Sequence, residues 1–152
     1  MDTHQTIVIT QAISEDIAEL FELYTKLHEN TIPEMDERVN EVIRHILVDP
    51  NYHLLIGRTE GRLVASVSLL VIPNLTHNQR PYALVENVIT DAMYRGHGYA
   101  TMLLEAARTI AVDNHCYKIM LMTGSKSDKT LAFYERAGYN QQDKTGFIQW
   151  LP

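Results

Sequence analysis

The stretch Tyr94-Arg95-Gly96-His97-Gly98-Tyr99-Ala100 decides how the rest of this sequence is interpreted. An apolar run over residues 82–90 precedes it, and an amphipathic pattern continues from it to about residue 113. This order predicts a strand, a glycine-containing turn and then a helix. Such a junction directs several backbone N–H groups and the positive end of a helix dipole at one point, where proteins commonly hold phosphate.

The spacing of the turn alone leaves two interpretations open, a phosphate site and a plain structural turn. Arg95 adds a fixed positive charge with a planar donor fork, and Gly96 and Gly98 allow a ligand to approach the backbone closely. The turn lacks the lysine and hydroxyl residue of a nucleotide phosphate loop and the third glycine of the dinucleotide fingerprint. A nucleotide-binding module is therefore the weakest interpretation.

Composition and charge narrow the class of protein. The chain has 152 residues, of which 45% are hydrophobic and 21% charged, which predicts one soluble globular domain over residues 1–152. A net charge of −6 argues against nucleic acid or an anionic membrane as a general partner. Cys116 is the single cysteine, so no intrachain disulfide forms and a reducing, cytoplasmic setting is expected. The sequence shows neither a signal peptide nor an apolar run of about 18 residues, so no membrane span is expected.

The order of elements follows from hydrophobic periodicity and from capping residues. Expected strands cover residues 6–10, 52–59, 63–72, 82–90, 117–122 and 145–151. Expected helices begin near Ser14, near Asp36, at the glycine turn and at Ser127 or Asp128, and Gly138 is the expected left-handed end of the last helix. The resulting order is β-α-α-β-β-β-α-β-α-β, an α/β (α+β) class in which helices pack on a mixed sheet.

Two segments resemble motifs of the GNAT superfamily of N-acetyltransferases. After the strand residues Val85-Glu86-Asn87-Val88-Ile89-Thr90, the glycine turn is similar to the coenzyme A motif [QR]-x-x-G-x-[GA], with Arg95, Gly98 and Ala100 at its fixed positions. The run Phe133-Tyr134-Glu135-Arg136-Ala137-Gly138-Tyr139 resembles the family element F-Y-x-x-x-G-[FY]. The resemblance implies the GNAT fold, a mostly antiparallel sheet of six to seven strands with about four helices.

Within the superfamily, the chain also shows a likeness to glucosamine-phosphate N-acetyltransferases. It rests on V-E-N-V-I-T, on the following Y-R-G, and on Asn114-His115-Cys116-Tyr117-Lys118-Ile119. Residues 123–129 form a longer loop than in those enzymes, and the N-terminal half shows no clear match. The resemblance therefore implies the reaction, whereas an amino sugar, an amino acid or a polyamine all stay candidate acceptors, as does a protein N-terminus or lysine.

The resemblance also implies a role for each motif residue. The coenzyme pyrophosphate would lie on the glycine turn, and the pantetheine arm would pair with the main chain at Val88 and Thr90. Glu86, expected by alternation on the same face as these two residues, would deprotonate the amine directly or through water, and Tyr134 would protonate the thiolate. The expected coenzyme contacts are Val88, Ile89, Thr90, Arg95, Gly96, His97, Gly98, Tyr99, Ala100 and Phe133.

Each of these roles has a plainer alternative. Glu86 can be a structural hydrogen-bonding residue, and Tyr134 can be a core tyrosine. The acidic residues Glu34, Asp36 and Glu37 attract a cationic amine or simply begin a solvated helix. Likewise, Ser125, Lys126 and Lys129 bind a phosphate or form a solvated loop.

The expected function is direct transfer of the acetyl group of acetyl-coenzyme A, a cosubstrate, to a small primary amine in a ternary complex. No metal is expected, because the histidines lack metal-ligand spacing. The alternative is a coenzyme-A-binding sensor or regulatory subunit without catalysis, which would keep the glycine turn and not need Glu86 or Tyr134. Relatives are often dimers, so a homodimer is an open expectation.

Overall fold

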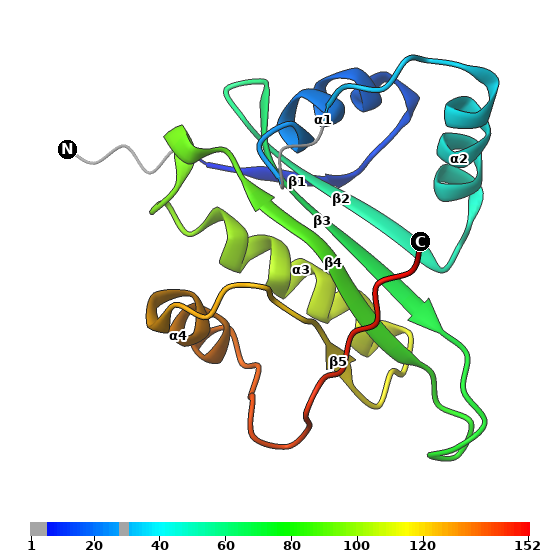
Figure 1. Ribbon diagram of the computed structural model, residues 1–152, viewed down its shortest axis with the longest axis vertical. Coiled ribbons are helices and arrows are strands. Elements are labelled where there is room, and N and C mark those ends of the chain that lie inside the picture. The colour runs from blue at the N-terminus through cyan, green and yellow to red at the C-terminus, as the bar shows by residue number, and fades with distance from the viewer. Residues whose placement is uncertain (1–5, 28–30) are drawn as a thin grey trace.

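The computed structural model describes residues 6–27 and 31–152, and its centre is one mixed sheet (Figure 1). The sheet has five strands in the order β1-β2-β3-β4-β5, antiparallel from β1 to β4 and parallel between β4 and β5. The strands are β1 (Val8–Gln11), β2 (Tyr52–Thr59), β3 (Arg62–Ile72), β4 (Tyr82–Thr90) and β5 (Ile119–Met120). The helices are α1 (Ile17–Tyr24), α2 (Glu37–Val48), α3 (Tyr99–Asp113) and α4 (Asp128–Arg136).

Each face of the sheet has its own apolar cluster. Leu103, Leu104 and Ala107 of α3 pack against one face, and α4 joins the same cluster through Phe133 and Tyr134. On the other face, α1 and α2 cover the sheet, and their apolar side chains form the second cluster with residues of β2 and β3. Burial of each large apolar side chain stabilises the fold by about 1.5–3 kcal/mol. The fold predicted from the sequence, an α+β arrangement with four helices, is confirmed.

The local signals in the sequence have the expected geometry at several helix ends and turns. The carboxylate of Asp36 accepts from the N–H of Val39 at 2.8 Å and caps α2. The hydroxyl of Ser127 accepts from the N–H of Thr130 at 3.2 Å and caps α4. Gly138 ends α4 with a φ of 95°, the left-handed conformation expected there. Ser14 differs, because it opens a 3-10 turn (Ser14–Asp16) instead of capping α1.

The expected last strand over residues 145–151 is wrong, and the sheet therefore has five strands where six to seven were expected. The segment is extended, but no described strand pairs with it, and the expected strand over residues 117–122 is reduced to the two residues of β5. In Figure 1 this red C-terminal segment runs past β5 as a coil. Its composition favours a strand, but a strand also needs a partner to satisfy its backbone groups.

A β-bulge interrupts β4 near its middle. Ser68 pairs with Glu86 and Ser66 pairs with Ile89, so that Asn87 and Val88 together lie opposite the single residue Val67. Asn87 has a φ of 53°, a left-handed conformation that asparagine tolerates better than most residues. The bulge reverses the alternation of side chains along β4, which decides how the site is arranged.

Candidate functional site

The outer edge of β4 is open over its second half. β5 pairs with β4 at Ala83 and Leu84 and then ends. The N–H of Asp91 donates to the carbonyl of Val64 in β3 at 2.8 Å. Because backbone groups alternate between the two edges of a strand, those of Val88 and Thr90 point away from β3, toward the open edge. The structure thus places both residues where the sequence predicts an extended ligand.

The side chains at this edge differ in what they contact. Val88 packs against the cluster on the α3 face, whereas Ile89 is buried in the cluster on the α1 face and takes a structural role. The hydroxyl of Thr90 is buried and has no hydrogen-bond partner among the described residues. Buried polar atoms are normally paired, so an orphan hydroxyl at an open strand edge suits an amide of an extended ligand such as pantetheine.

The glycine turn has the shape of an anion site. Gly96 and Gly98 have φ values of 80° and 79°, and Gly98 begins α3 without a side-chain cap. A Cβ atom added to either glycine would meet no described atom within 4 Å, so the space beside the turn is open. The first N–H groups of a helix have no acceptor within the helix and attract an anion. The geometry therefore fits the pyrophosphate that the sequence predicts at this turn.

Arg95 and His97 shape the turn through their side chains. The Nε of Arg95 donates to the carbonyl of Thr90 at 3.3 Å, which ties the turn to the end of β4. The Nδ1 of His97 lies 3.1 Å from the carbonyl of Tyr94 and 3.0 Å from that of Arg95. Both oxygens only accept, so Nδ1 carries the proton. The ring of Tyr99 is buried in the core, so Tyr99 is placed to act through its main chain.

Asp91 joins this turn to the segment that follows α1. Its carboxylate accepts from the Nζ of Lys26 at 2.5 Å and from the N–H of Met93 at 3.0 Å, and Arg62 lies 4.0 Å away. The side chain of Asp91 is only 4% exposed. The hydrogen bond from Lys26 lowers the pKa of Asp91 more than burial raises it. The ionised form of Asp91 is therefore the one that the folded state stabilises.

Replacing Asp91 with asparagine is expected to lower the free energy of unfolding by about 1–3 kcal/mol at neutral pH, because a charged hydrogen bond is lost. Since the folded pKa is below the unfolded one, this contribution is present above about pH 4 and is lost as pH falls through the folded value. Urea unfolding at pH 7 and at pH 3 measures it. The exposed Asp113→Asn is the control, with a change within about 0.5 kcal/mol. A difference that stays constant with pH would contradict the ionic role of Asp91.

Glu86 faces the opposite side of the sheet from Val88 and Thr90. It pairs with Ser68, whose Oγ accepts a hydrogen bond from the hydroxyl of Tyr52 at 3.3 Å on the α1–α2 side. Cross-strand partners share a face, so Glu86 lies on that side as well. The expectation that simple alternation places Glu86 beside Val88 and Thr90 is wrong, because the bulge adds a residue between them.

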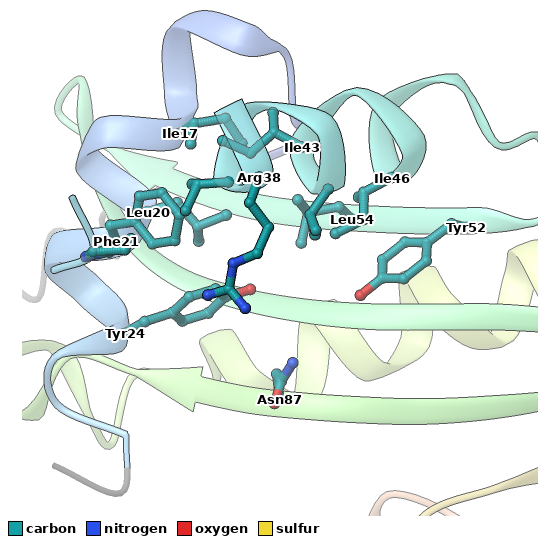
Figure 2. Close-up of a pocket in the computed structure, with 13 residues that line it drawn as sticks. Ile17, Leu20, Phe21, Tyr24, Arg38, Ile43, Ile46, Tyr52, Leu54 and Asn87 are labelled. Atoms are coloured by element: carbon teal, nitrogen blue, oxygen red, sulfur yellow. The ribbon is translucent and has the colours of Figure 1, made fainter. Parts of the chain in front are cut away.

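A pocket of about 350 Å³ opens on this same side, between α1, α2 and the sheet (Figure 2). Its polar groups come from Tyr24, Arg38, Tyr52 and Asn87. The apolar lining residues are Ile17, Leu20, Phe21, Pro33, Val39, Val42, Ile43, Ile46 and Leu54. Asn87 belongs to the bulge, so a single peptide unit separates the pocket from Val88 at the open edge. One feature of the sequence indicates the polar part of this pocket. Arg38 lies four residues before Val42, so the two side chains share the apolar face of α2.

The acidic residues expected near the start of α2 do not line the pocket. Asp36 caps the helix, and Glu37 forms an ion pair with Arg44 at 2.7 Å. Glu34 is exposed. The capped, solvated helix start is thus the account that the structure supports.

Tyr134 lies on the α3 face, on α4. Its ring packs against Phe133 at 5.0 Å and Tyr139 at 6.3 Å, and all three contact the cluster that also holds Val88. Burial raises the pKa of Tyr134, so its phenol is protonated at neutral pH. The hydroxyl makes no hydrogen bond to any described residue. The structure thus gathers Val88, Phe133 and Tyr134 on one face of the sheet and Glu86 on the other, with the bulge between.

Residues 17–139 match the acetyltransferase (GNAT) family. The chain belongs to this family. A putative acetyltransferase from Agrobacterium tumefaciens str. C58 is 35% identical, with a TM-score of 0.87 over 95% of this chain and 99% of that one. The expectation of an acetyl-coenzyme-A-dependent N-acetyltransferase domain is confirmed at the level of the family.

Two relatives are glucosamine 6-phosphate N-acetyltransferases, the enzymes that the sequence resembles. A glucosamine 6-phosphate N-acetyltransferase of Trypanosoma brucei brucei is 34% identical over 84 residues, and the match spans 55% of each chain, about half the length of that relative. The crystal structure of glucosamine-6-phosphate N-acetyltransferase from Arabidopsis thaliana resembles this GNAT chain with a TM-score of 0.85 and a sequence identity of 20%. The likeness covers 97% of this chain and 99% of that one. The second likeness shows the GNAT fold.

The structure also describes the surroundings of the remaining candidate residues of this GNAT chain. Among the described residues, no three His, Cys, Asp or Glu side chains are grouped to hold a metal ion. Burial raises the pKa of the Cys116 thiol, which makes it a poor nucleophile. Ser125, Lys126 and Lys129 lie on an exposed loop and helix start. Within residues 6–27 and 31–152, no helix has the length and apolar character needed to cross a bilayer.

Proposed function

We propose that this GNAT chain is an N-acetyltransferase that moves the acetyl group of acetyl-coenzyme A to the primary amine of a small molecule. One observation carries the proposal: the open edge of β4 and a separate pocket meet at the bulge of Asn87 and Val88. Such an arrangement suits two ligands that react directly with each other, in a ternary complex, because each has its own site and the two sites adjoin.

The donor side is built from main chain and small residues. The pyrophosphate of the coenzyme would lie against the N–H groups from Gly96 to Ala100, with Arg95 adding positive charge. The pantetheine amides would pair with the backbone of Val88 and Thr90 like an added strand. The orphan hydroxyl of Thr90 and the open space beside both glycines fit this occupant.

The chemistry follows from the two faces. The amine nitrogen attacks the thioester carbonyl carbon, the C–N bond forms, and the C–S bond breaks with its electron pair leaving on sulfur. Glu86, on the pocket side, takes the amine proton directly or through water, and the backbone near Val88 stabilises the oxyanion. Tyr134, on the other face with a protonated phenol, gives its proton to the thiolate.

The test is release of coenzyme A thiol from acetyl-coenzyme A against a panel of amines. The panel contains glucosamine 6-phosphate, apolar and polar amino acids, and polyamines, and each reaction is repeated with Glu86→Gln. We expect release with at least one amine and slower turnover in the variant. Coenzyme binding without release for every amine would support the alternative of a non-catalytic sensor. Equal turnover in Glu86→Gln would remove Glu86 as the base.

We also propose that the chain forms a homodimer in which the second copy covers the C-terminal segment. Four large apolar side chains in this segment are 61–90% exposed: Phe147, Ile148, Trp150 and Leu151. The segment has the composition of a strand but pairs with no strand of residues 6–27 and 31–152, and β5 is the last strand of the described sheet. A strand edge and an apolar segment without partners in one copy complement each other between two copies.

Dimer formation is expected to shift the fluorescence of Trp150, the only tryptophan, because it buries an indole that is 84% exposed in the single chain. The emission should move to longer wavelength on dilution, in step with a fall in mass from two chains to one by light scattering. Removing residues 145–152 should leave a monomer at every concentration. A wild-type chain that stays monomeric at high micromolar concentration would contradict the proposal.

A further inference from the structure

The pocket between α1, α2 and the sheet combines apolar walls with a single charged residue. Nine of its thirteen lining residues are apolar, and Arg38 is the only one with a charge at neutral pH. The phenols of Tyr24 and Tyr52 and the amide of Asn87 supply neutral polar groups. No carboxylate lines the pocket, so its own residues leave the charge of Arg38 without a counterion.

Arg38 is exposed and has no carboxylate partner among the described residues, unlike three other arginines of this chain. Arg44 pairs with Glu37 at 2.7 Å, Arg58 pairs with Asp16 at 2.8 Å, and Arg108 pairs with Glu105 at 3.2 Å. Among residues 6–27 and 31–152, Arg38 has neither an ion pair nor a hydrogen bond from its side chain. Figure 2 shows its side chain extending from α2 into the pocket, toward the side where Tyr24 and Asn87 lie. An unpaired guanidinium directed into an apolar pocket is suited to a carboxylate, which it binds through two parallel hydrogen bonds.

We propose that the acceptor is a hydrophobic α-amino acid, and that Arg38 binds its carboxylate. The apolar walls formed by α1 and α2 take the side chain of the amino acid. The amine and the carboxylate share one carbon atom, so both lie at the same end of the ligand. We place that end on the side of the pocket toward which Arg38 extends, where Asn87 of the bulge precedes Val88 at the donor edge.

The apolar lining also disfavours the main alternative, an amino sugar. A sugar carries a hydroxyl on most of its carbon atoms, and each hydroxyl that leaves water without a new partner is costly. The four polar side chains that line the pocket satisfy a carboxylate and an amine more readily than a ring of hydroxyls. The inference rests on the proposed acetyl transfer for its chemistry, but binding of the amino acid tests it independently.

The test compares acids with their uncharged amides. Calorimetry measures L-phenylalanine, L-leucine and L-methionine, each beside its carboxamide, with the protein saturated with coenzyme A. We expect at least one acid to bind about 10- to 100-fold more tightly than its amide. Arg38→Gln should abolish this difference by weakening the acid alone, and Arg38→Lys should restore part of it. Arg44→Gln, on the same helix but paired with Glu37, is the matched control and should keep the wild-type difference.

Several outcomes would overturn the assignment. One is that none of the three acids binds, and another is that acid and amide bind the wild type with equal affinity. A third is that Arg38→Gln weakens the acid and the amide equally, which would indicate that Arg38 has a structural role. Binding of glucosamine 6-phosphate that depends on Arg38, without binding of the acids, would show that the anion is a phosphate and the body polar. Release of thiol from acetyl-coenzyme A is measured in parallel. If the acids bind but no amine causes release, the proposed acetyl transfer is overturned, whereas the assignment of Arg38 as the carboxylate site stands.

Discussion

Replacing Tyr134 with phenylalanine is expected to lower kcat by about 100- to 10,000-fold, the usual contribution of a general acid. The affinity for acetyl-coenzyme A should change little, because the phenyl ring keeps the packing against Phe133 and Tyr139. The variant loses only the hydroxyl, which makes no hydrogen bond to any described residue and is therefore available to the thiolate. Steady-state thiol release with the best amine gives kcat, and calorimetry gives the coenzyme affinity.

Tyr139→Phe is the matched control for this experiment. Its hydroxyl is buried without a described partner, and burial raises the pKa of Tyr139 to about 12. Its removal should leave kcat unchanged. Burial also raises the pKa of Tyr134 above its ordinary value of about 10. Loss of the Tyr134 proton should therefore cause no decrease in kcat below about pH 10. Unchanged turnover in Tyr134→Phe would leave Tyr134 as a core residue.

Replacing Gly98 with valine is expected to weaken acetyl-coenzyme A binding by about 100-fold, the loss of one or two charge-assisted hydrogen bonds. No atom of the described residues lies within 4 Å of the position that a Cβ would take at Gly98, which is the space proposed for the pyrophosphate. A valine side chain would fill that space and block the N–H groups behind it. Calorimetric titration with acetyl-coenzyme A measures the effect.

Gly61→Val separates the loss of the ligand from backbone strain. Gly61 has a φ of 78°, almost the same as the 79° of Gly98, and its Cβ position is equally open. Both variants should lose about 1–2 kcal/mol of stability, because a β-branched residue is strained in the left-handed region. Gly61 lies in the turn between β2 and β3, so only Gly98→Val should weaken the coenzyme. Equal affinities in the two variants would show that the turn does not hold the pyrophosphate.

Local chemistry accounts for the parts of the fold that the sequence predicted well. The side chains of Asp36 and Ser127 reach N–H groups three residues ahead, so their roles as caps depend on few neighbours. Gly98 and Gly138 occupy backbone conformations that favour glycine, and their places follow from residue type. The position of the glycine turn directly after β4 is in the same class, because the turn and the strand are adjacent in the chain.

Features that depend on distant partners were not predictable in this way. Residues 145–151 have the composition of a strand, but pairing depends on an edge elsewhere in the sheet or in another copy. The bulge of β4 has two signs in the sequence: the consecutive polar residues Glu86 and Asn87 break strict alternation, and asparagine tolerates a positive φ. Neither sign specifies a bulge without the pairing to β3. Arg38 belongs to the pocket only because α1 and α2 lie over the same part of the sheet.

The bulge in β4 also has an evolutionary consequence. The donor edge and the glycine turn belong to β4 and α3, whereas the walls of the pocket come mainly from α1 and α2. The donor edge and the pocket adjoin at the peptide unit between Asn87 and Val88. Substitutions in the two N-terminal helices can therefore alter which amine is accepted without disturbing the shared donor. A new substrate preference can arise in this chain through mutations confined to one third of its length, while the reaction itself is inherited unchanged.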